Sequence, residues 1–350
     1  PQTGAVAERY SHSADYQEAE DWERSPFFVL YQKRSRRLHL RIAQDEGVDR
    51  FPLIAQFQSE GATDYLAIRV EHTGKAAIGG EDAAFISFAT NKQGGFTLQD
   101  IRGLERLAPC LTLSERGSSA ARIVRTVATT YMGKAASQRV MAGQIVRGQA
   151  ERMSAVLWFS DLRDYTRTAD AIEPEKVIPF LNDHVAPQVE EITAQGGNVV
   201  KLVGDGVLAL FPINSPPDTP EVAGRVLAAA ARVLARMDDV TRDRLESGEV
   251  ACSLSLGLHV GDVYFGNVGG LVRLDFTVIG PAVNETARIE GMSRALDQKA
   301  VVSERFAETL VPSDREKLVA LGRYALRGVR RPQQLYALDP DFLSQSRHAI

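Results

Sequence analysis

The sequence KLVGDGVLALF, residues 201–211, joins two apolar runs through the tip Gly204-Asp205-Gly206. Apolar runs on both sides of a glycine-containing tip predict a tight β-hairpin. Asp205 stands at the tip of that hairpin. A single aspartate in a glycine turn most often only forms the turn, so a functional interpretation needs a second motif.

A second carboxylate ends another apolar run, in AVLWFSDLRDYT, residues 155–166. The run predicts a strand that ends at Asp161, and polar residues suited to a helix start follow it. Such a turn directs backbone N–H groups and the helix dipole toward a phosphate. A carboxylate at the strand end can hold the cation that accompanies the phosphate. Asp161 and Asp205 together suggest a shared metal site.

A third motif is DFTVIGPAVNETARIE, residues 275–290, which predicts a strand up to Gly280-Pro281 and then a helix. Asn284 and Arg288 are four positions apart and therefore lie on one face of that helix. An amide and a cation presented together can orient a ribose and offset a developing negative charge. The alternative is a solvated helix face, the usual interpretation of a single Asn/Arg pair.

Together with LGLHVGDVYFGNVG, residues 256–269, these motifs resemble the class III adenylyl/guanylyl cyclase catalytic domain in order and spacing. The resemblance covers about residues 154–338. It implies a ferredoxin-like βαββαβ core with added strands, so the expected fold class is α/β (α+β).

The resemblance also implies roles for individual residues. Asp161 and Asp205, with the backbone carbonyl of Leu162, match the ligands of two divalent cations, Mg²⁺ or Mn²⁺. Asn284 and Arg288 match the pair that orients the ribose and stabilises the transition state. No covalent nucleophile is needed, because two cations would clamp the triphosphate while its 3′-hydroxyl attacks the α-phosphorus.

Five further residues match substrate-binding positions. Lys201 stands where a lysine recognises adenine and where guanylyl cyclases typically carry glutamate. Thr277 takes the second base-recognising position, as in the bicarbonate-responsive subclass. Arg327 matches a basic residue that contacts the terminal phosphates, and Phe159 and Thr166 lie in the phosphate-side motif.

The expected function is an adenylyl cyclase that converts ATP to 3′,5′-cyclic AMP and pyrophosphate. In this family the metal aspartates come from one subunit and the base, ribose and arginine contacts from its partner. A chain carrying both sets implies a head-to-tail homodimer. The alternatives are a guanylyl cyclase, which Lys201 opposes, and a non-catalytic cyclase-fold binding module, which the complete set of catalytic residues opposes.

Some positions depart from the family pattern. Asp164 and Tyr165 stand where Gly and Phe are usual, and Asp164 adds a negative charge near the triphosphate unless its side chain turns outward. Ser255 stands where some members have a phosphate-binding arginine, and Pro281 replaces a common aspartate.

The N-terminal half is predicted to be a second α/β domain, over residues 25–112, after a polar tail at 1–24. Its strand order and Gly94-Gly95-Phe96 resemble a GAF-like sensor of unknown ligand, and a ligand-free dimerisation scaffold is an equal alternative. Strands are predicted at 38–42, 65–70 and 84–90, a short helix over 51–57, and the glycine-bearing segment Gly74–Gly80 between the last two strands.

A capping-box-like start at Thr97 and Asp100 predicts a helix over about 97–131, weakened at Gly117. Its length of about 30 residues favours an inter-domain, dimer-forming signalling helix over the alternative of a buried core helix. Residues 132–148 are predicted to be a glycine-punctuated connection. The domain boundaries expected are a helical linker over 113–150 and the cyclase domain over 151–340.

Bulk properties exclude several classes. The net charge of −4 and pI near 6.0 oppose a nucleic-acid partner. No apolar run approaches the roughly 18 residues of a membrane span. Two cysteines without a CxxC motif and six scattered histidines oppose a disulfide framework or a zinc site and favour a cytoplasmic protein. The chain begins at Pro1, so the missing signal peptide carries no conclusion.

Overall fold

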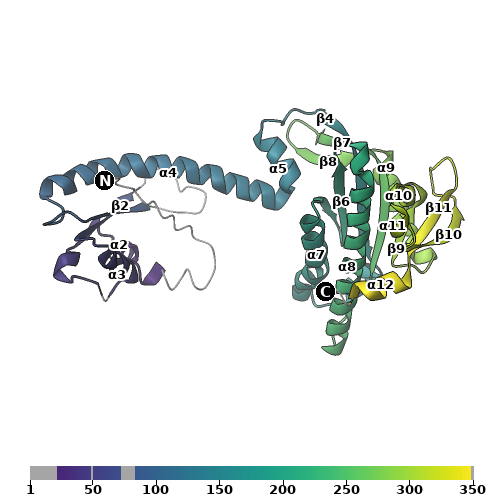
Figure 1. Cartoon of the computed structure of the whole chain (residues 1–350), viewed down its shortest axis with the longest axis horizontal. Coiled ribbons are helices and arrows are strands. Elements are labelled where there is room, and N and C mark those ends of the chain that lie inside the picture. Colours follow the sequence, from purple (N-terminus) through teal and green to yellow (C-terminus); the bar gives the residue numbers. More distant parts are fainter. Residues whose placement is uncertain (1–21, 49, 72–82, 348–350) are drawn as a thin grey trace. The chain divides into compact units, whose positions relative to one another are not determined.

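The computed structural model describes residues 22–48, 50–71 and 83–347. The chain divides into two compact units, Pro1–Val124 and Arg125–Ile350, each built from helices and sheet (Figure 1). The predicted α/β fold class is therefore confirmed. The segment Gly74–Gly80 and most of the polar tail fall outside the described residues.

The first unit is built on three antiparallel strands in the order β1-β2-β3. The strands are β1 (Arg37–Leu40), β2 (Asp64–Glu71) and β3 (Ala83–Thr90), and the helical segments before α4 are α2 (Pro26–Lys33), η1 (Ile42–Gln44) and α3 (Pro52–Ser59). Leu30, Ile54 and Tyr65 are fully buried in the cluster between these helices and the sheet. The three predicted strands and the short helix are thus present, but Ile42 begins a 3₁₀ turn instead of extending β1.

Helix α4 (Leu98–Met132) begins at the predicted capping box. The backbone N–H of Thr97 donates to Asp100 Oδ2 over 2.8 Å, and the backbone N–H of Asp100 donates back to Thr97 Oγ1 over 3.1 Å. These bonds satisfy two N–H groups that a helix start otherwise leaves free. The helix continues through Gly117, where the sequence predicted a weak point.

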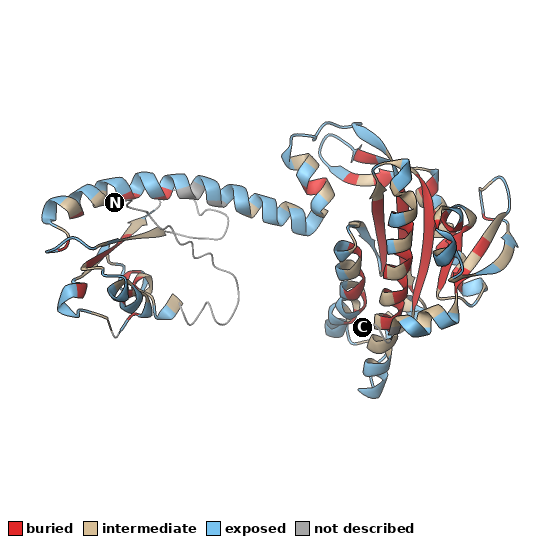
Figure 2. Cartoon of the chain, viewed as in Figure 1, coloured by how far each residue is buried: buried red, intermediate tan, exposed pale blue. Residues whose placement is uncertain are grey.

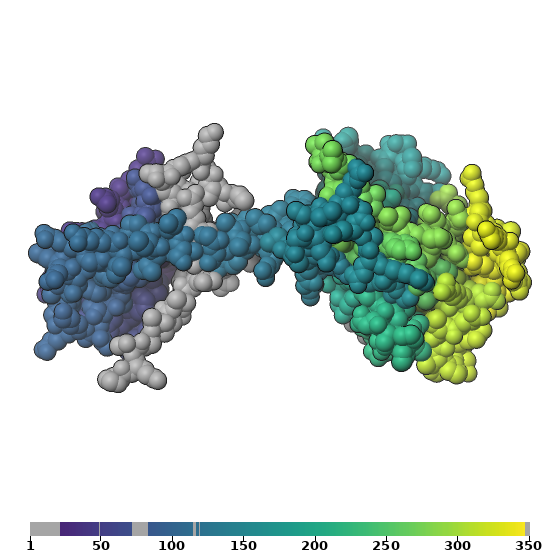
Figure 3. Space-filling view, turned by 90° about the horizontal axis from the view of Figure 1, so that it is seen from above, coloured from purple at the N-terminus to yellow at the C-terminus, as the bar shows by residue number. Residues whose placement is uncertain are grey.

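The second unit contains an eight-stranded sheet with the path β10-β11-β9-β7-β4-β6-β5, and β8 pairs with β7 beside that path. The strands are β4 (Ala150–Leu162), β5 (Asn198–Val203), β6 (Gly206–Ile213), β7 (Leu254–Gly269), β8 (Leu274–Ile279), β9 (Ala300–Ser303), β10 (Leu318–Tyr324) and β11 (Gln333–Leu338). All pairs are antiparallel except β7 with β9. Figure 3 shows β10 and β11 in yellow tones at one end of this unit.

The helical segments of the second unit are α5 (Lys134–Met141), α6 (Tyr165–Ala171), α7 (Pro174–Ala194), η2 (Pro216–Asp218), α8 (Thr219–Glu246), α9 (Pro281–Ala295), α10 (Glu304–Thr309), α11 (Pro312–Arg315) and α12 (Pro340–Arg347). Helix α5 lies within residues 132–148, which the sequence predicted to be a glycine-punctuated connection inside a helical linker over 113–150. Gly133 and Gly143 have positive φ and bound the helix, and the eight residues between Gly133 and Ala142 include neither Gly nor Pro. The glycines therefore mark the ends of a helix.

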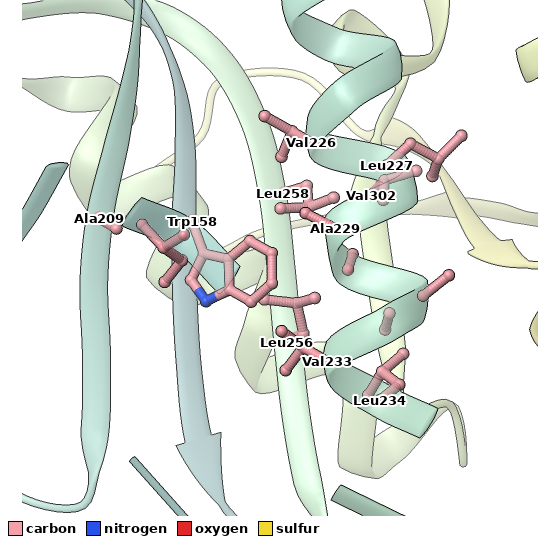
Figure 4. Packing of buried hydrophobic residues seen from close by; sticks show 14 of the residues in the cluster. Trp158, Ala209, Val226, Leu227, Ala229, Val233, Leu234, Leu256, Leu258 and Val302 are labelled. Atoms are coloured by element: carbon pink, nitrogen blue, oxygen red, sulfur yellow. The ribbon is translucent and has the colours of Figure 1, made fainter. Parts of the chain in front are cut away.

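Strand β4 is buried on both faces, which explains its unbroken apolar run. Val156 and Trp158 lie in the larger core cluster, where α8 covers the sheet (Figures 2 and 4). Ala155 and Leu157 face a second cluster that β8 and α5 cover. Because both faces are packed, the end of β4 at Asp161 has a fixed position.

Candidate active site

The β5–β6 hairpin brings Asp205 to the end of β4. Gly204 has φ +64°, a conformation that glycine adopts without strain, and β6 begins directly after Asp205. A Cβ at Gly206 would overlap the carbonyl oxygen of Ser160, so only glycine permits this close approach. The backbone N–H of Leu162 donates to Asp205 Oδ2 over 3.1 Å. The hairpin predicted from the sequence is present, and it joins the two predicted metal-binding aspartates.

The carboxylates of Asp161 and Asp205 lie close together, and the side chain of Asp161 is partly buried. Burial raises the pKa of Asp161 to about 7, and the hydrogen bond and charge of Asp205 and the charge of Glu290 add to the effect. Among the described residues, no three His, Cys, Asp or Glu side chains converge into a metal-binding group. The oxygen donors predicted to hold a cation here are the carboxylates of Asp161 and Asp205 and the backbone carbonyl of Leu162. Hard oxygen donors of this kind suit Mg²⁺ or Mn²⁺.

Ser255 lies beneath this pair and connects it to α9. Its Oγ lies 3.0 Å from the Asp161 carbonyl oxygen and 2.5 Å from Glu290 Oε1. Burial raises the pKa of Glu290, and the bond from Ser255 partly offsets that rise. Ser255 is buried, so it braces the strand end and does not stand on the surface where a phosphate would arrive.

Asp164 stands where glycine is usual in the family that the sequence resembles. Its φ is +60°, a backbone conformation that favours glycine. Its side chain is exposed and lies 3.4 Å from Arg294 Nη2 on α9. The carboxylate is thus turned outward and paired with a cation. Two other predicted substrate-binding residues precede and follow Asp161 in the sequence. Phe159 packs against the second core cluster, and Thr166 is exposed on α6.

Lys201 is exposed on β5, and its Nζ lies 2.6 Å from Asp275 Oδ2 on β8. Thr277 follows two positions later on β8, opposite Gly266 of β7. Lys201 thus lies beside β8, the strand that carries Thr277. Asp275 was not singled out from the sequence, because nothing local indicates a partner 74 positions away.

Asn284 and Arg288 line one open hollow of about 590 Å³ at the start of α9. The other lining residues are Ile279, Gly280, Pro281, Glu285, Gly328, Val329 and Arg330. A Cβ at Gly328 would lie 3.3 Å from Arg288 Nη1, so the guanidinium rests against this glycine. Arg327, chosen from the sequence, is exposed and does not line the hollow, whereas its neighbours 328–330 do.

The predicted residues therefore form two groups in one chain. Asp161 and Asp205 meet at the end of β4, while Asn284 and Arg288 share the hollow on α9. Neither aspartate is among the described residues that line the hollow.

None of the helices in the described part of the chain has the length and hydrophobicity that a membrane span requires.

The fold and these residue groups belong to a nucleotide cyclase domain. The family model "Adenylate and Guanylate cyclase catalytic domain" matches residues 149–340, so the chain belongs to that family. The chain is 32% identical over 167 residues to an adenylate cyclase of Anabaena cylindrica, which covers 47% of this chain and 32% of that protein. It is 31% identical over 176 residues to the terminal-differentiation-specific adenylate cyclase of Dictyostelium discoideum, covering 50% of this chain and 8% of that protein.

Among solved structures, a bacterial light-regulated adenylyl cyclase aligns with a TM-score of 0.55 and 20% identity. The alignment covers 69% of this chain and 70% of that one, and at this identity it supports the fold alone. The chain spans about a third or less of the length of the two curated relatives named above.

Proposed function

We propose that this protein is an adenylyl cyclase that converts ATP to 3′,5′-cyclic AMP and pyrophosphate. The observation that carries the proposal is the meeting of Asp161 and Asp205 at the end of β4, in a chain that also presents Asn284 and Arg288 in one hollow. The adenylate cyclase activity named for the Anabaena and Dictyostelium relatives supports the same choice.

Each group of residues has a distinct part in this reaction. Asp161, Asp205 and the Leu162 carbonyl would hold two divalent cations, and these would supply charge neutralisation for the triphosphate and a lower pKa for the 3′-hydroxyl. Asn284 orients the ribose so that the hydroxyl lies in line with the α-phosphorus. Arg288 offsets the charge that develops on the α-phosphoryl oxygens. Positioning and electrostatics account for most of the rate in such a transfer.

The choice of ATP over GTP rests on Lys201 and Thr277. The Lys201 ammonium donates hydrogen bonds, which suits the N1 acceptor of adenine and leaves the N1–H donor of guanine without an acceptor. A site that leaves a buried polar group unpaired discriminates strongly against the wrong base. Thr277 is half-buried and can accept from the adenine amino group or donate elsewhere.

We propose that the active unit is a head-to-tail homodimer. The two residue groups would then belong to different sites, one supplied by each subunit. Exposed apolar side chains cluster on the β7–β8 arm, where a second copy would cover them. They are Tyr264, Val268, Leu271, Val272, Leu274 and Ile279.

Regulation would come from the first unit through α4. Ile101 and Ala108 of this helix pack on the first unit's sheet, while other apolar residues of the helix are exposed and available to a second copy. These are Leu107, Leu111, Leu113, Val124, Val127 and Tyr131. We expect two regulators of the cyclase activity in the cytoplasm. One is an unknown ligand that binds the GAF-like first unit, and the other is bicarbonate, which would act near Thr277.

The test is to incubate the purified chain with ATP or GTP, each with Mn²⁺ or Mg²⁺, and to quantify both cyclic nucleotides. We expect cyclic AMP from ATP at a rate well above that of cyclic GMP from GTP, and none from Asp161→Ala. Equal rates would remove the assignment of Lys201 as the base reader. Nucleotide binding without either product would make the chain a binding module.

A further inference from the structure

Lys201 is held by a carboxylate from a strand that is not its neighbour in the sheet. Its Nζ lies 2.6 Å from Asp275 Oδ2, a short distance typical of a charge-assisted hydrogen bond. Strand β5 pairs with β6, whereas β8 pairs with β7. The contact therefore depends on the packing of β8 over this face of the sheet.

That packing also fixes which way Asp275 points. Phe276 and Val278 of β8 are buried in the second core cluster with Leu208 of β6. Because side chains alternate along a strand, Asp275 and Thr277 share the opposite face of β8. The ion pair thus holds the Lys201 ammonium beside the face that carries Thr277.

We propose that Asp275 is a positioning residue for base recognition, which acts by fixing Lys201 in place before the nucleotide binds. This inference rests on the proposed function. An ammonium has three N–H donors, so one bond to Asp275 leaves two for the base. A lysine fixed at the position of adenine N1 opposes the N1–H of guanine, whereas a mobile lysine could move to the guanine O6 acceptor. Asp275 would therefore increase both the affinity for ATP and the discrimination against GTP.

The experiment compares Asp275→Asn and Asp275→Glu in the full chain with Asp262→Asn as the matched control. Asp262 forms a similarly exposed ion pair with Arg152, over 2.9 Å, in the same unit. For Asp275→Asn we expect KM for ATP to rise about 3- to 10-fold, the range of a half-exposed charged hydrogen bond. The ratio of kcat/KM for ATP over GTP should fall by a similar factor with kcat nearly unchanged. Asp275→Glu should restore most of both quantities, and Asp262→Asn should change neither.

An unchanged KM and nucleotide preference in Asp275→Asn would overturn the proposal. So would equal losses in Asp275→Asn and Asp262→Asn, because these would indicate a general structural defect.

A second measurement needs no catalysis and separates this inference from the proposed function. The rate at which an amine-acylating reagent labels Lys201, followed by peptide mass spectrometry without nucleotide, should rise in Asp275→Asn and not in Asp262→Asn. If the wild type makes no cyclic AMP, the proposed function fails, yet the labelling still decides whether Asp275 holds Lys201. Equal labelling of the wild type and Asp275→Asn would overturn the positioning role.

Discussion

The guanidinium of Arg288 rests against Gly328, with only 3.3 Å between Nη1 and the place where a Cβ would stand. Gly328 also has φ +72°. This glycine therefore sets how far the guanidinium can approach from one side. A methyl group there would displace it by a few tenths of an ångström, which matters for a group that we propose stabilises a transition state.

Gly328→Ala should accordingly lower kcat about tenfold, less than the loss expected when such a donor is removed outright. Gly248→Ala is the matched control, because Gly248 has φ +73° and a methyl group added there would meet no atom within 4 Å. Both variants should lose about 1 kcal/mol of stability from backbone strain. Steady-state kinetics and thermal unfolding distinguish the two effects. Equal kcat values for the two variants would show that Gly328 does not position Arg288.

Asp164→Gly should improve the use of ATP. The substitution restores a residue that adopts φ +60° freely and removes a negative charge from the predicted phosphate turn. We expect KM for ATP to fall about threefold at low salt, as for the loss of one exposed charge several ångströms from a triphosphate. Arg294→Gln should raise KM, because it removes the cation that pairs with Asp164. The control is Asp170→Asn, which removes an exposed charge later on α6. A change in KM equal to that of Asp164→Gly would show that the effect comes from net charge.

Mixing two inactive variants tests the shared sites. Asp161→Ala and Arg288→Ala should each be inactive, and together they should recover about a quarter of wild-type activity, since half of the dimers are mixed and each has one intact site. Asp161→Ala mixed with Asp205→Ala should stay inactive, because both lack the same half. Two affinity tags can demonstrate that mixed dimers form. If mixed dimers form but are inactive, each chain completes its own site.

His259 should lower the stability of the second unit in mild acid, whereas Asp161, whose pKa is raised to about 7, contributes in the opposite direction. Burial lowers the pKa of His259 to about 4, Glu285 opposes that shift and Arg305 adds to it. The unfolded chain takes up the proton near pH 6.5 and the folded chain does not, so stability is lost as pH falls from about 6.5 toward 4. The contribution between pH 6.5 and 5 is about 2 kcal/mol.

Urea unfolding followed through Trp158, in a Trp22→Phe background, measures this loss. His259→Gln should be less stable at pH 7.5, because it loses the 2.8 Å contact with Ser303. It should also lack the loss of stability that His259 contributes below pH 6.5, so the difference in stability between the two proteins should shrink as pH falls. Parallel pH profiles for the two proteins would contradict the assignment. The pKa of His184 is also lowered, chiefly by burial, so some acid sensitivity should remain in the variant.

The features predicted correctly from the sequence are those that local chemistry determines. The capping box at Thr97, the Gly204-Asp205 turn and the Asn284/Arg288 helix face depend on residues within a few positions of one another. The bounds of helix α5 were not predicted, because the glycines at its ends were interpreted only as interruptions of the connection. Roles assigned by resemblance, such as those of Thr166 and Arg327, stay predictions.

Contacts that long-range packing creates could not be predicted in this way. Asp275 reaches Lys201, and Gly328 reaches Arg288, only after β8 and the segment before β11 have taken their places. Neither Asp275 nor Gly328 stands in a local sequence pattern that indicates a role. The roles proposed for them come from the side chains that they contact, Lys201 and Arg288.

The bond between Ser255 and Glu290 has a consequence for the proposed dimer. Ser255 also contacts the carbonyl of Asp161, and Glu290 lies one half-turn beyond Arg288 on α9. In the proposed head-to-tail dimer these two ends would serve different catalytic centres, and one buried hydroxyl would join them within each subunit. A change that nucleotide binding makes at the first centre would then have a continuous chain of contacts, through Ser255, to the helix that serves the second.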